Sequence, residues 1–165
     1  MTTVTAFIGI GSNLQDPKTQ VRTALRELDQ LPYTRLAAKS SLYRSDPMGP
    51  ADQPDYINAV AAITTLLSPF ALLDALLGIE RAHGRIRGAT RWGPRTLDLD
   101  ILAYGDRAIT EPRLTVPHVG IGERAFVLLP LAEIAPAFEV PGKGRVDTLA
   151  ANCPRTGIHR LNDHD

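Results

Sequence analysis

Two short motifs, Asp16-Pro17 and Ser68-Pro69, constrain the fold more than any other feature of this sequence. Each places a helix-capping side chain directly before a proline, a combination that favours the first turn of a helix. Each motif also follows a strand-like apolar run, and another such run comes after each helix. The first hundred residues therefore predict two units in which a strand leads into a helix.

The predicted elements alternate along the chain. Strands are expected over residues 5–10, 35–43, 56–66 and 97–103. Helices are expected to begin at Pro17 and Pro69, and to end at Pro32 and near His83. This order is that of the ferredoxin-like fold. We therefore expect an α+β protein with a ferredoxin-like βαββαβ core, an antiparallel sheet, both helices packed on one face and a C-terminal extension.

Apolar residues repeat at helical spacing in both predicted helices. The first helix has the predicted buried residues Val21, Ala24, Leu25, Leu28 and Leu31. The second has Phe70, Leu73, Leu76 and Leu77. The next position on this second face is Glu80, where a buried carboxylate requires a hydrogen-bond partner. Either Glu80 has rotated into solvent at the helix end, or it is buried and accepts hydrogen bonds from a ligand.

The size and charge of the chain exclude several classes of protein. Its 165 residues predict a single domain over residues 1–165. Its 18 basic and 18 acidic residues cancel, so no overall field favours nucleic acid or an anionic membrane. No apolar run approaches the roughly 18 residues of a membrane span, and residues 1–11 show no signal-peptide pattern. We expect a cytoplasmic monomer that binds neither nucleic acid nor membrane.

An acidic pair lies on the last predicted strand. The alternation of a strand places Leu97, Leu99 and Ile101 on one face, and Asp98 and Asp100 on the other. With Cα atoms about 6.5 to 7 Å apart, two parallel carboxylates can share one or two hard cations such as Mg²⁺. Taken alone, the same pattern is also typical of a solvated strand face.

Five arginines lie within fifteen residues directly before this pair, namely Arg81, Arg85, Arg87, Arg91 and Arg95. Guanidinium groups bind phosphate through paired hydrogen bonds. Residues 84–95 show no periodicity, so they predict an exposed functional loop, which we expect to close as a lid over bound substrates. A solvated loop is the simpler interpretation of the arginines alone. Together with the acidic pair, they indicate a phosphoryl transferase that uses a nucleotide.

Two common nucleotide-binding motifs are missing from the sequence. The pair Gly9-Ile10-Gly11 lacks the third glycine of the dinucleotide-binding motif, because Leu14 stands at that position. The chain contains no P-loop motif. An ATP site would therefore consist of side chains and metal.

Residues 91–102, with the sequence RWGPRTLDLDIL, closely resemble the signature of the 6-hydroxymethyl-7,8-dihydropterin pyrophosphokinases. Residues 10–14, 52–59 and 113–118 also resemble segments of this family, in the order of the family. The family transfers the β,γ-pyrophosphoryl group of ATP to the hydroxymethyl oxygen of the pterin and releases AMP in folate biosynthesis. The resemblance implies this activity, with ATP as co-substrate and two Mg²⁺ ions as cofactors.

The resemblance also implies roles for individual residues. Asp98 and Asp100 would bind both Mg²⁺ ions, and Arg85 and Arg95 would act on the phosphates. The positions similar to nucleotide-binding residues of the family are Leu73, Glu80, Arg87, Trp92, Ile101, Arg113, Thr115, His118 and Arg124. The positions similar to pterin-binding residues are Ser45, Pro47, Met48, Tyr56, Asn58 and Phe126. Among these, the rings of Tyr56 and Phe126 would enclose the pterin, and Asn58 would bind its edge.

Two other functions are compatible with parts of the sequence. Ferredoxin-like sheets with aromatic and arginine residues also bind single-stranded RNA, although Asp98 and Asp100 would repel an RNA backbone. A catalytically inactive relative of the enzyme is the third candidate, but every major charged position of the signature is present. Formation of AMP that requires both the pterin and Mg²⁺ would distinguish the three.

Overall fold

The computed structural model describes residues 2–46, 54–84, 97–122, 124–155 and 157–162. The first part of the chain contains β1 (Val4–Ser12), α1 (Pro17–Leu28), β2 (Thr34–Lys39), β3 (Tyr43–Ser45), β4 (Tyr56–Thr65), α2 (Pro69–Ala82) and β5 (Asp98–Tyr104). The second part adds β6 (Ile109–Glu111), β7 (Leu114–Val116), α3 (Ala125–Ile134), β8 (Glu139–Val140), β9 (Gly144–Arg145), α4 (Val146–Ala151) and β10 (Ile158–Arg160). Both predicted helices begin at the expected prolines, and the first one ends at Leu28, four residues before the expected Pro32.

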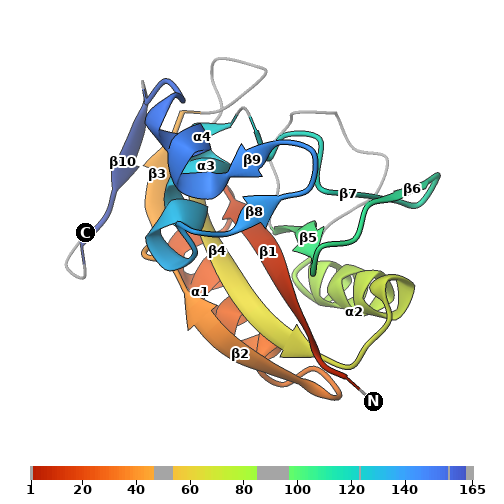
Figure 1. The fold of residues 1–165 in the computed structure, drawn as a ribbon. Helices are drawn as coiled ribbons and strands as arrows, with labels where there is room; N and C mark the ends of the chain where they lie inside the picture. Colours follow the sequence, from red (N-terminus) through yellow and green to blue (C-terminus); the bar gives the residue numbers. More distant parts are fainter. Residues whose placement is uncertain (1, 47–53, 85–96, 123, 156, 163–165) are drawn as a thin grey trace.

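An antiparallel sheet organises the molecule (Figure 1). Its strand order is β10-β3-β4-β1-β5, and β2 also pairs with β4. Residues 35–43 and 56–66, both expected to form strands, lie antiparallel to one another, because β2 and β3 both pair with β4. Two small sheets, β6-β7 and β8-β9, complete the described strands. The protein therefore has the expected α+β architecture with an antiparallel sheet.

The strand predicted over residues 35–43 is divided at Ser40. The backbone N–H of Ser40 donates to the carbonyl of Val60 at 2.9 Å, and the N–H of Val60 donates to the Ser40 hydroxyl at 2.9 Å. A side-chain oxygen thus takes the place of a main-chain acceptor in the ladder. The single predicted strand was wrong in this respect, since a hydroxyl can compete with a backbone carbonyl for a strand donor.

Helices cover both faces of the sheet (Figure 1). On one face, α1 and α2 bury a core against β1, β4 and β5, as predicted. On the other face, Val127 of α3 and Val146 of α4 pack with Phe7 and Leu102. The sheet lies between the two cores, and successive residues of β1 point to opposite sides: Ile8 belongs to the first core and Phe7 to the second. The cleft described below lies on the α3 side of the sheet.

The buried face of α2 differs in part from the predicted one. The buried apolar side chains of this helix are Leu72, Leu76 and Ile79, together with Pro69, whereas Phe70 is 36% exposed. The prediction was right for Leu76, which is buried, and for Leu73, which packs against the core, but wrong for Phe70 and Leu77. The predicted face was off in part because α2 is apolar over most of its circumference. Helical spacing alone then does not reveal which side meets the sheet.

The C-terminal extension returns to the sheet edge. Its apolar residues 126–134 form most of α3, although Pro130 lies inside the helix and removes one helical donor. Further on, β10 pairs with β3, and its first residue, Ile158, lies opposite Ser45. In the part of the chain that the structure describes, no helix has the length and hydrophobicity needed to cross a membrane.

Candidate active site

The two aspartates of β5 face a cleft. Leu97, Leu99 and Ile101 are buried in the core beneath α2, whereas Asp98 and Asp100 line the cleft on the opposite side of the strand. The predicted alternation along this strand is therefore confirmed. The acidic face is not simply a solvated surface, because it forms one wall of a concave site.

Glycines of β1 lie opposite these aspartates. In the register of β1 and β5, Gly11 pairs with Asp98 and Gly9 pairs with Asp100. Cross-strand partners share one face of a sheet, so β1 places no side chain directly opposite either carboxylate. A Cβ atom on Gly11 would lie 3.2 Å from Oδ1 of Asn58. Gly9 and Gly11 are not part of a dinucleotide-binding motif. Because they have no side chains, they leave the floor of the cleft open.

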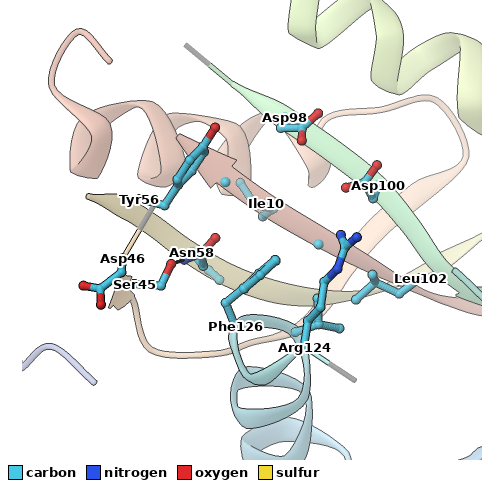
Figure 2. A pocket seen from close by; sticks show the side chains of 14 residues that line it. Ile10, Ser45, Asp46, Tyr56, Asn58, Asp98, Asp100, Leu102, Arg124 and Phe126 are labelled. Atoms are coloured by element: carbon cyan, nitrogen blue, oxygen red, sulfur yellow. Dashed lines mark hydrogen bonds between the residues drawn. The ribbon is translucent and has the colours of Figure 1, made fainter. Parts of the chain in front are cut away.

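Side chains from distant parts of the sequence line this cleft (Figure 2). The space within it, which opens to solvent, is about 680 Å³. The predicted site residues along its wall are Ser45, Tyr56, Asn58, Asp98, Asp100, Arg124 and Phe126. They come from β3, β4, β5 and the beginning of α3. Predicted pterin-binding, metal-binding and phosphate-binding positions thus share one cavity.

One end of the cleft combines aromatic rings with a fixed amide. Figure 2 shows Tyr56 and Phe126, from β4 and α3, on two sides of the cleft. Between them, Asn58 is buried, and its Nδ2 donates to Oγ of Ser45 at 2.7 Å. Asn13 supports this end, because its Nδ2 donates to the carbonyl of Pro54, two residues before Tyr56. Such a site is suited to a flat heterocycle with a polar edge.

The other end of the cleft is charged. Arg124 is the N-cap residue of α3, and its carbonyl accepts from the N–H groups of Val127 and Leu128 at 3.0 and 2.9 Å. Its Cζ atom lies 5.8 Å from the centroid of the Phe126 ring. Figure 2 shows the guanidinium on the side of the cleft that carries Asp100. A cation facing two carboxylates can bind phosphate while the carboxylates bind a metal.

His118 lies next to the acidic pair. Its Nε2 is 3.9 Å from Oδ1 of Asp100, and its Nδ1 accepts the backbone N–H of Gly120 at 3.0 Å. Burial lowers the pKa of His118, the charge of Arg124 lowers it further, and Asp98 opposes both effects. Because Nδ1 accepts a hydrogen bond, the proton of the neutral imidazole is on Nε2, towards Asp100. His118 can therefore donate a hydrogen bond at the edge of the cleft.

Glu80 contacts the same strand from the core side. It is 2% exposed, and its Oε2 accepts the backbone N–H of Leu99 at 2.7 Å. The alternative in which Glu80 turns into solvent was wrong, because α2 continues to Ala82 and keeps this position on its buried side. The carboxylate thus joins α2 to the strand that carries both aspartates.

A family model described as 7,8-dihydro-6-hydroxymethylpterin-pyrophosphokinase (HPPK) matches residues 7–136. The chain belongs to the HPPK family. One HPPK relative, from Pseudomonas aeruginosa, is 52% identical over 155 residues, which is 94% of this chain and 95% of the relative. Another, from Haemophilus influenzae, is 53% identical over 159 residues, which is 96% and 99% of the two chains. Both are named 2-amino-4-hydroxy-6-hydroxymethyldihydropteridine pyrophosphokinase.

The HPPK fold also occurs in solved structures of a longer protein. The structure of wild-type Plasmodium falciparum HPPK-DHPS matches this chain with a TM-score of 0.71 at 15% identity. The match covers 91% of this chain and 44% of the other, so this chain spans less than half the length of that protein. At this identity the likeness supports the fold alone. The family predicted from the sequence is nevertheless confirmed by the curated relatives.

Several nucleotide-binding positions implied by the HPPK resemblance do not line the cleft. Ile101 packs in the core with a 4% exposed side chain, and Leu73 packs partly buried against the same core. Arg113 pairs with Asp74 and lies 5.8 Å from the centroid of the Phe70 ring. Thr115 is exposed on β7. Arg113 and Thr115 belong to the β6-β7 hairpin, and the pair of Arg113 with Asp74 joins this hairpin to α2.

The remaining predicted HPPK site residues lie outside the described residues. They are Pro47, Met48, Arg85, Arg87, Trp92 and Arg95, together with the predicted lid except Gly84. The structure also adds cleft side chains that the sequence analysis missed, namely Ile10, Asp46, Ala59, Leu102 and Val127. No local pattern distinguishes these residues from their neighbours in the sequence. Their place follows from strand register and from the packing of α3 on the sheet.

Proposed function

We propose that this protein transfers the pyrophosphoryl group of ATP to the hydroxymethyl group of 6-hydroxymethyl-7,8-dihydropterin. The products are AMP and the pterin diphosphate, an intermediate of folate biosynthesis. One observation carries this proposal: a single cleft of an HPPK-family chain holds an aromatic end and a charged end. A flat acceptor and a triphosphate could therefore bind side by side.

The aromatic end is the proposed pterin site. The rings of Tyr56 and Phe126 would contact the two faces of the pterin, and such a contact contributes about 1 kcal/mol beyond the burial of area. Asn58 would hydrogen-bond to the pterin edge, and its bond to Ser45 fixes the orientation of the amide. Pro47 and Met48 would complete this site.

The charged end fits the proposed magnesium site. Its donor set is two carboxylates on one strand face, beside space that the glycines of β1 leave open. Over the residues that the structure describes, no group of three or more His, Cys, Asp or Glu side chains forms a complete metal cage. Mg²⁺ commonly uses one or two carboxylates and takes water and phosphate oxygens as its other ligands. When bound, two Mg²⁺ ions would neutralise the triphosphate and polarise its oxygens.

The proposed reaction mainly requires positioning by the protein. Arg124, with Arg85 and Arg95, would hold the phosphates, and the aromatic pair would aim the hydroxymethyl oxygen at the β-phosphorus. His118 would donate a hydrogen bond near Asp100. The nucleotide would extend between α2 and β7 and contact Leu73, Arg113 and Thr115, and Arg87 and Trp92 would also contact it. The buried Glu80 and Ile101 would support this region from the core. No covalent intermediate with the protein is required.

We also propose a finer description of the fold and its setting. The order β3-β4-β1-β5, with α1 and α2 on one face, supports a ferredoxin-like core. The protein would act as a single-domain monomer in the cytoplasm. Its zero net charge supports a function without nucleic acid or membrane partners.

Product analysis tests the proposed function. The protein is incubated with ATP, the hydroxymethyl dihydropterin and Mg²⁺, and the products are separated by chromatography and identified by mass. We expect equal amounts of AMP and pterin diphosphate, and neither product when the pterin is left out or Mg²⁺ is chelated. ADP as the nucleotide product, or AMP formed without the pterin, would contradict the proposal.

A further inference from the structure

We propose that Gly120 is a positioning residue that holds the side chain of Arg124 in the cleft; this inference rests on the proposed role of Arg124. A Cβ atom on Gly120 would lie 2.7 Å from both Cδ and Nε of Arg124, and 3.0 Å from its Cζ. Real Cβ contacts essentially never fall below 3.0 Å. The arginine side chain therefore occupies the space that any other residue at position 120 would need.

The need for glycine at position 120 is one of space and not of backbone conformation. The φ angle of Gly120 is outside the left-handed region, unlike those of Gly105 and Gly142. An alanine can adopt the backbone conformation of Gly120 without strain. Substitution at this position would consequently act on the neighbouring side chain and leave the turn intact.

Backbone contacts hold the turn between Gly120 and Arg124 in place. The N–H of Arg124 donates to the carbonyl of Gly120 at 3.1 Å, and the N–H of Gly120 donates to Nδ1 of His118 at 3.0 Å. Arg124 is also fixed as the N-cap residue of α3. These contacts restrain the backbone of Arg124, whereas its side chain can still rotate. An added methyl group at position 120 would displace the guanidinium from its place above Phe126.

Gly120 therefore contacts two predicted site residues, His118 and Arg124, through different atoms. Its N–H selects the imidazole tautomer of His118, and alanine would preserve this bond because it retains the N–H group. Its missing side chain makes room for Arg124. The substitution Gly120→Ala thus separates the two effects and tests the second one alone.

Gly122 provides a matched control in the same turn. A Cβ atom at Gly122 would lie 3.2 Å from Cδ of Lys143 and has no atom of Arg124 among its nearest neighbours. We would compare Gly120→Ala, Gly122→Ala, Arg124→Ala and the double variant Gly120→Ala/Arg124→Ala. Each is measured for turnover, thermal unfolding and the NMR resonance of the Arg124 Nε–H group.

We expect Gly120→Ala to lower kcat about 10- to 100-fold, as a small misplacement of a group at a reacting centre does. It should also shift the Arg124 Nε–H resonance, with little change in Tm, while Gly122→Ala does neither. The double variant should match Arg124→Ala, because the methyl group then has nothing to displace. An unmoved resonance, additive losses in the double variant, or unfolding of Gly120→Ala would overturn the positioning role. Normal turnover in Arg124→Ala would instead overturn the proposed role of Arg124 in the reaction.

Discussion

The backbone N–H of Leu99 donates a 2.7 Å hydrogen bond to Oε2 of the buried side chain of Glu80. Leu99 separates the two aspartates of the cleft, and β5 is at the edge of the sheet, where β1 is its strand neighbour. An edge strand presents backbone donors that no further strand accepts. Glu80 accepts one of them, which explains why a carboxylate continues the buried side of α2.

Removing this acceptor should destabilise the protein. In Glu80→Leu, the Leu99 N–H would lose its acceptor inside the core, which costs about 1 to 3 kcal/mol. Glu80→Gln retains an oxygen acceptor of the same shape and should lose less. Urea unfolding monitored by circular dichroism measures both variants. Equal stability of Glu80→Leu and the wild type would contradict the structural role of this bond.

A second polar contact joins α3 to β3 and to the segment before it, on the other side of the sheet from β5. Glu133 of α3 accepts the hydroxyl of Tyr43 at 2.7 Å and the backbone N–H of Ser41 at 3.0 Å. The pKa of Tyr43 is raised by burial first, and then by its hydrogen bond to Glu133 and the charge of that carboxylate. Arg160 acts in the opposite direction. Tyr43 therefore keeps its proton in the folded protein at pH values where an unfolded tyrosine has lost it.

This raised pKa predicts a loss of stability at alkaline pH. The contribution of Tyr43 is fully present below about pH 10, where a tyrosine of the unfolded chain begins to ionise. It is lost as the pH rises above that value, because only the unfolded state then releases the proton. Tyr43→Phe should reduce the decrease in unfolding free energy above pH 10, whereas Tyr33→Phe, at a 75% exposed position, should not. The same alkaline decrease in wild type and Tyr43→Phe would refute this assignment.

The two rings of the cleft should affect one substrate selectively. Tyr56→Ala and Phe126→Ala should each weaken pterin binding at least about fivefold, which corresponds to the roughly 1 kcal/mol of an aromatic contact. ATP binding should change little. Calorimetric titrations with each ligand measure the difference, and Phe70→Ala on the outer side of α2 is the control for pterin binding. Equal losses for both ligands would show that the rings serve the general packing of the protein.

The sequence analysis succeeded where a local pattern determines the structure. Pro17 and Pro69 marked both helix starts, and the alternation around Asp98 placed the aspartates on one face. These features depend on the φ angle of proline and on side-chain direction in a strand. Local information of this kind was sufficient for the acidic wall of the site. Of the two predicted capping residues, Ser68 accepts the N–H of Ala71, whereas Asp16 makes no side-chain cap hydrogen bond, so that part of the prediction was wrong.

The features that the sequence analysis missed depend on distant residues. Ser40 interrupts a strand through hydrogen bonds with Val60, and β10 is formed by pairing with β3. The helix that carries Phe126 was obscured by Pro130 and by its apolar residues on several sides. Likewise, Gly9 and Gly11 open the cleft because they pair with Asp100 and Asp98 of β5. No motif in the sequence predicts this register.

The most direct test of the account is the turnover of Asp98→Asn and Asp100→Asn, measured as pterin-dependent AMP formation over a range of Mg²⁺ concentrations. Each variant keeps the shape of the side chain and removes the charge that would hold the metal. The matched control is Asp106→Asn, in the exposed turn after β5. We predict at least about 100-fold lower turnover in each cleft variant at saturating Mg²⁺, with unchanged unfolding free energy and a normal control. Near wild-type turnover in either cleft variant would contradict the assignment of these two carboxylates as the metal site of pyrophosphoryl transfer.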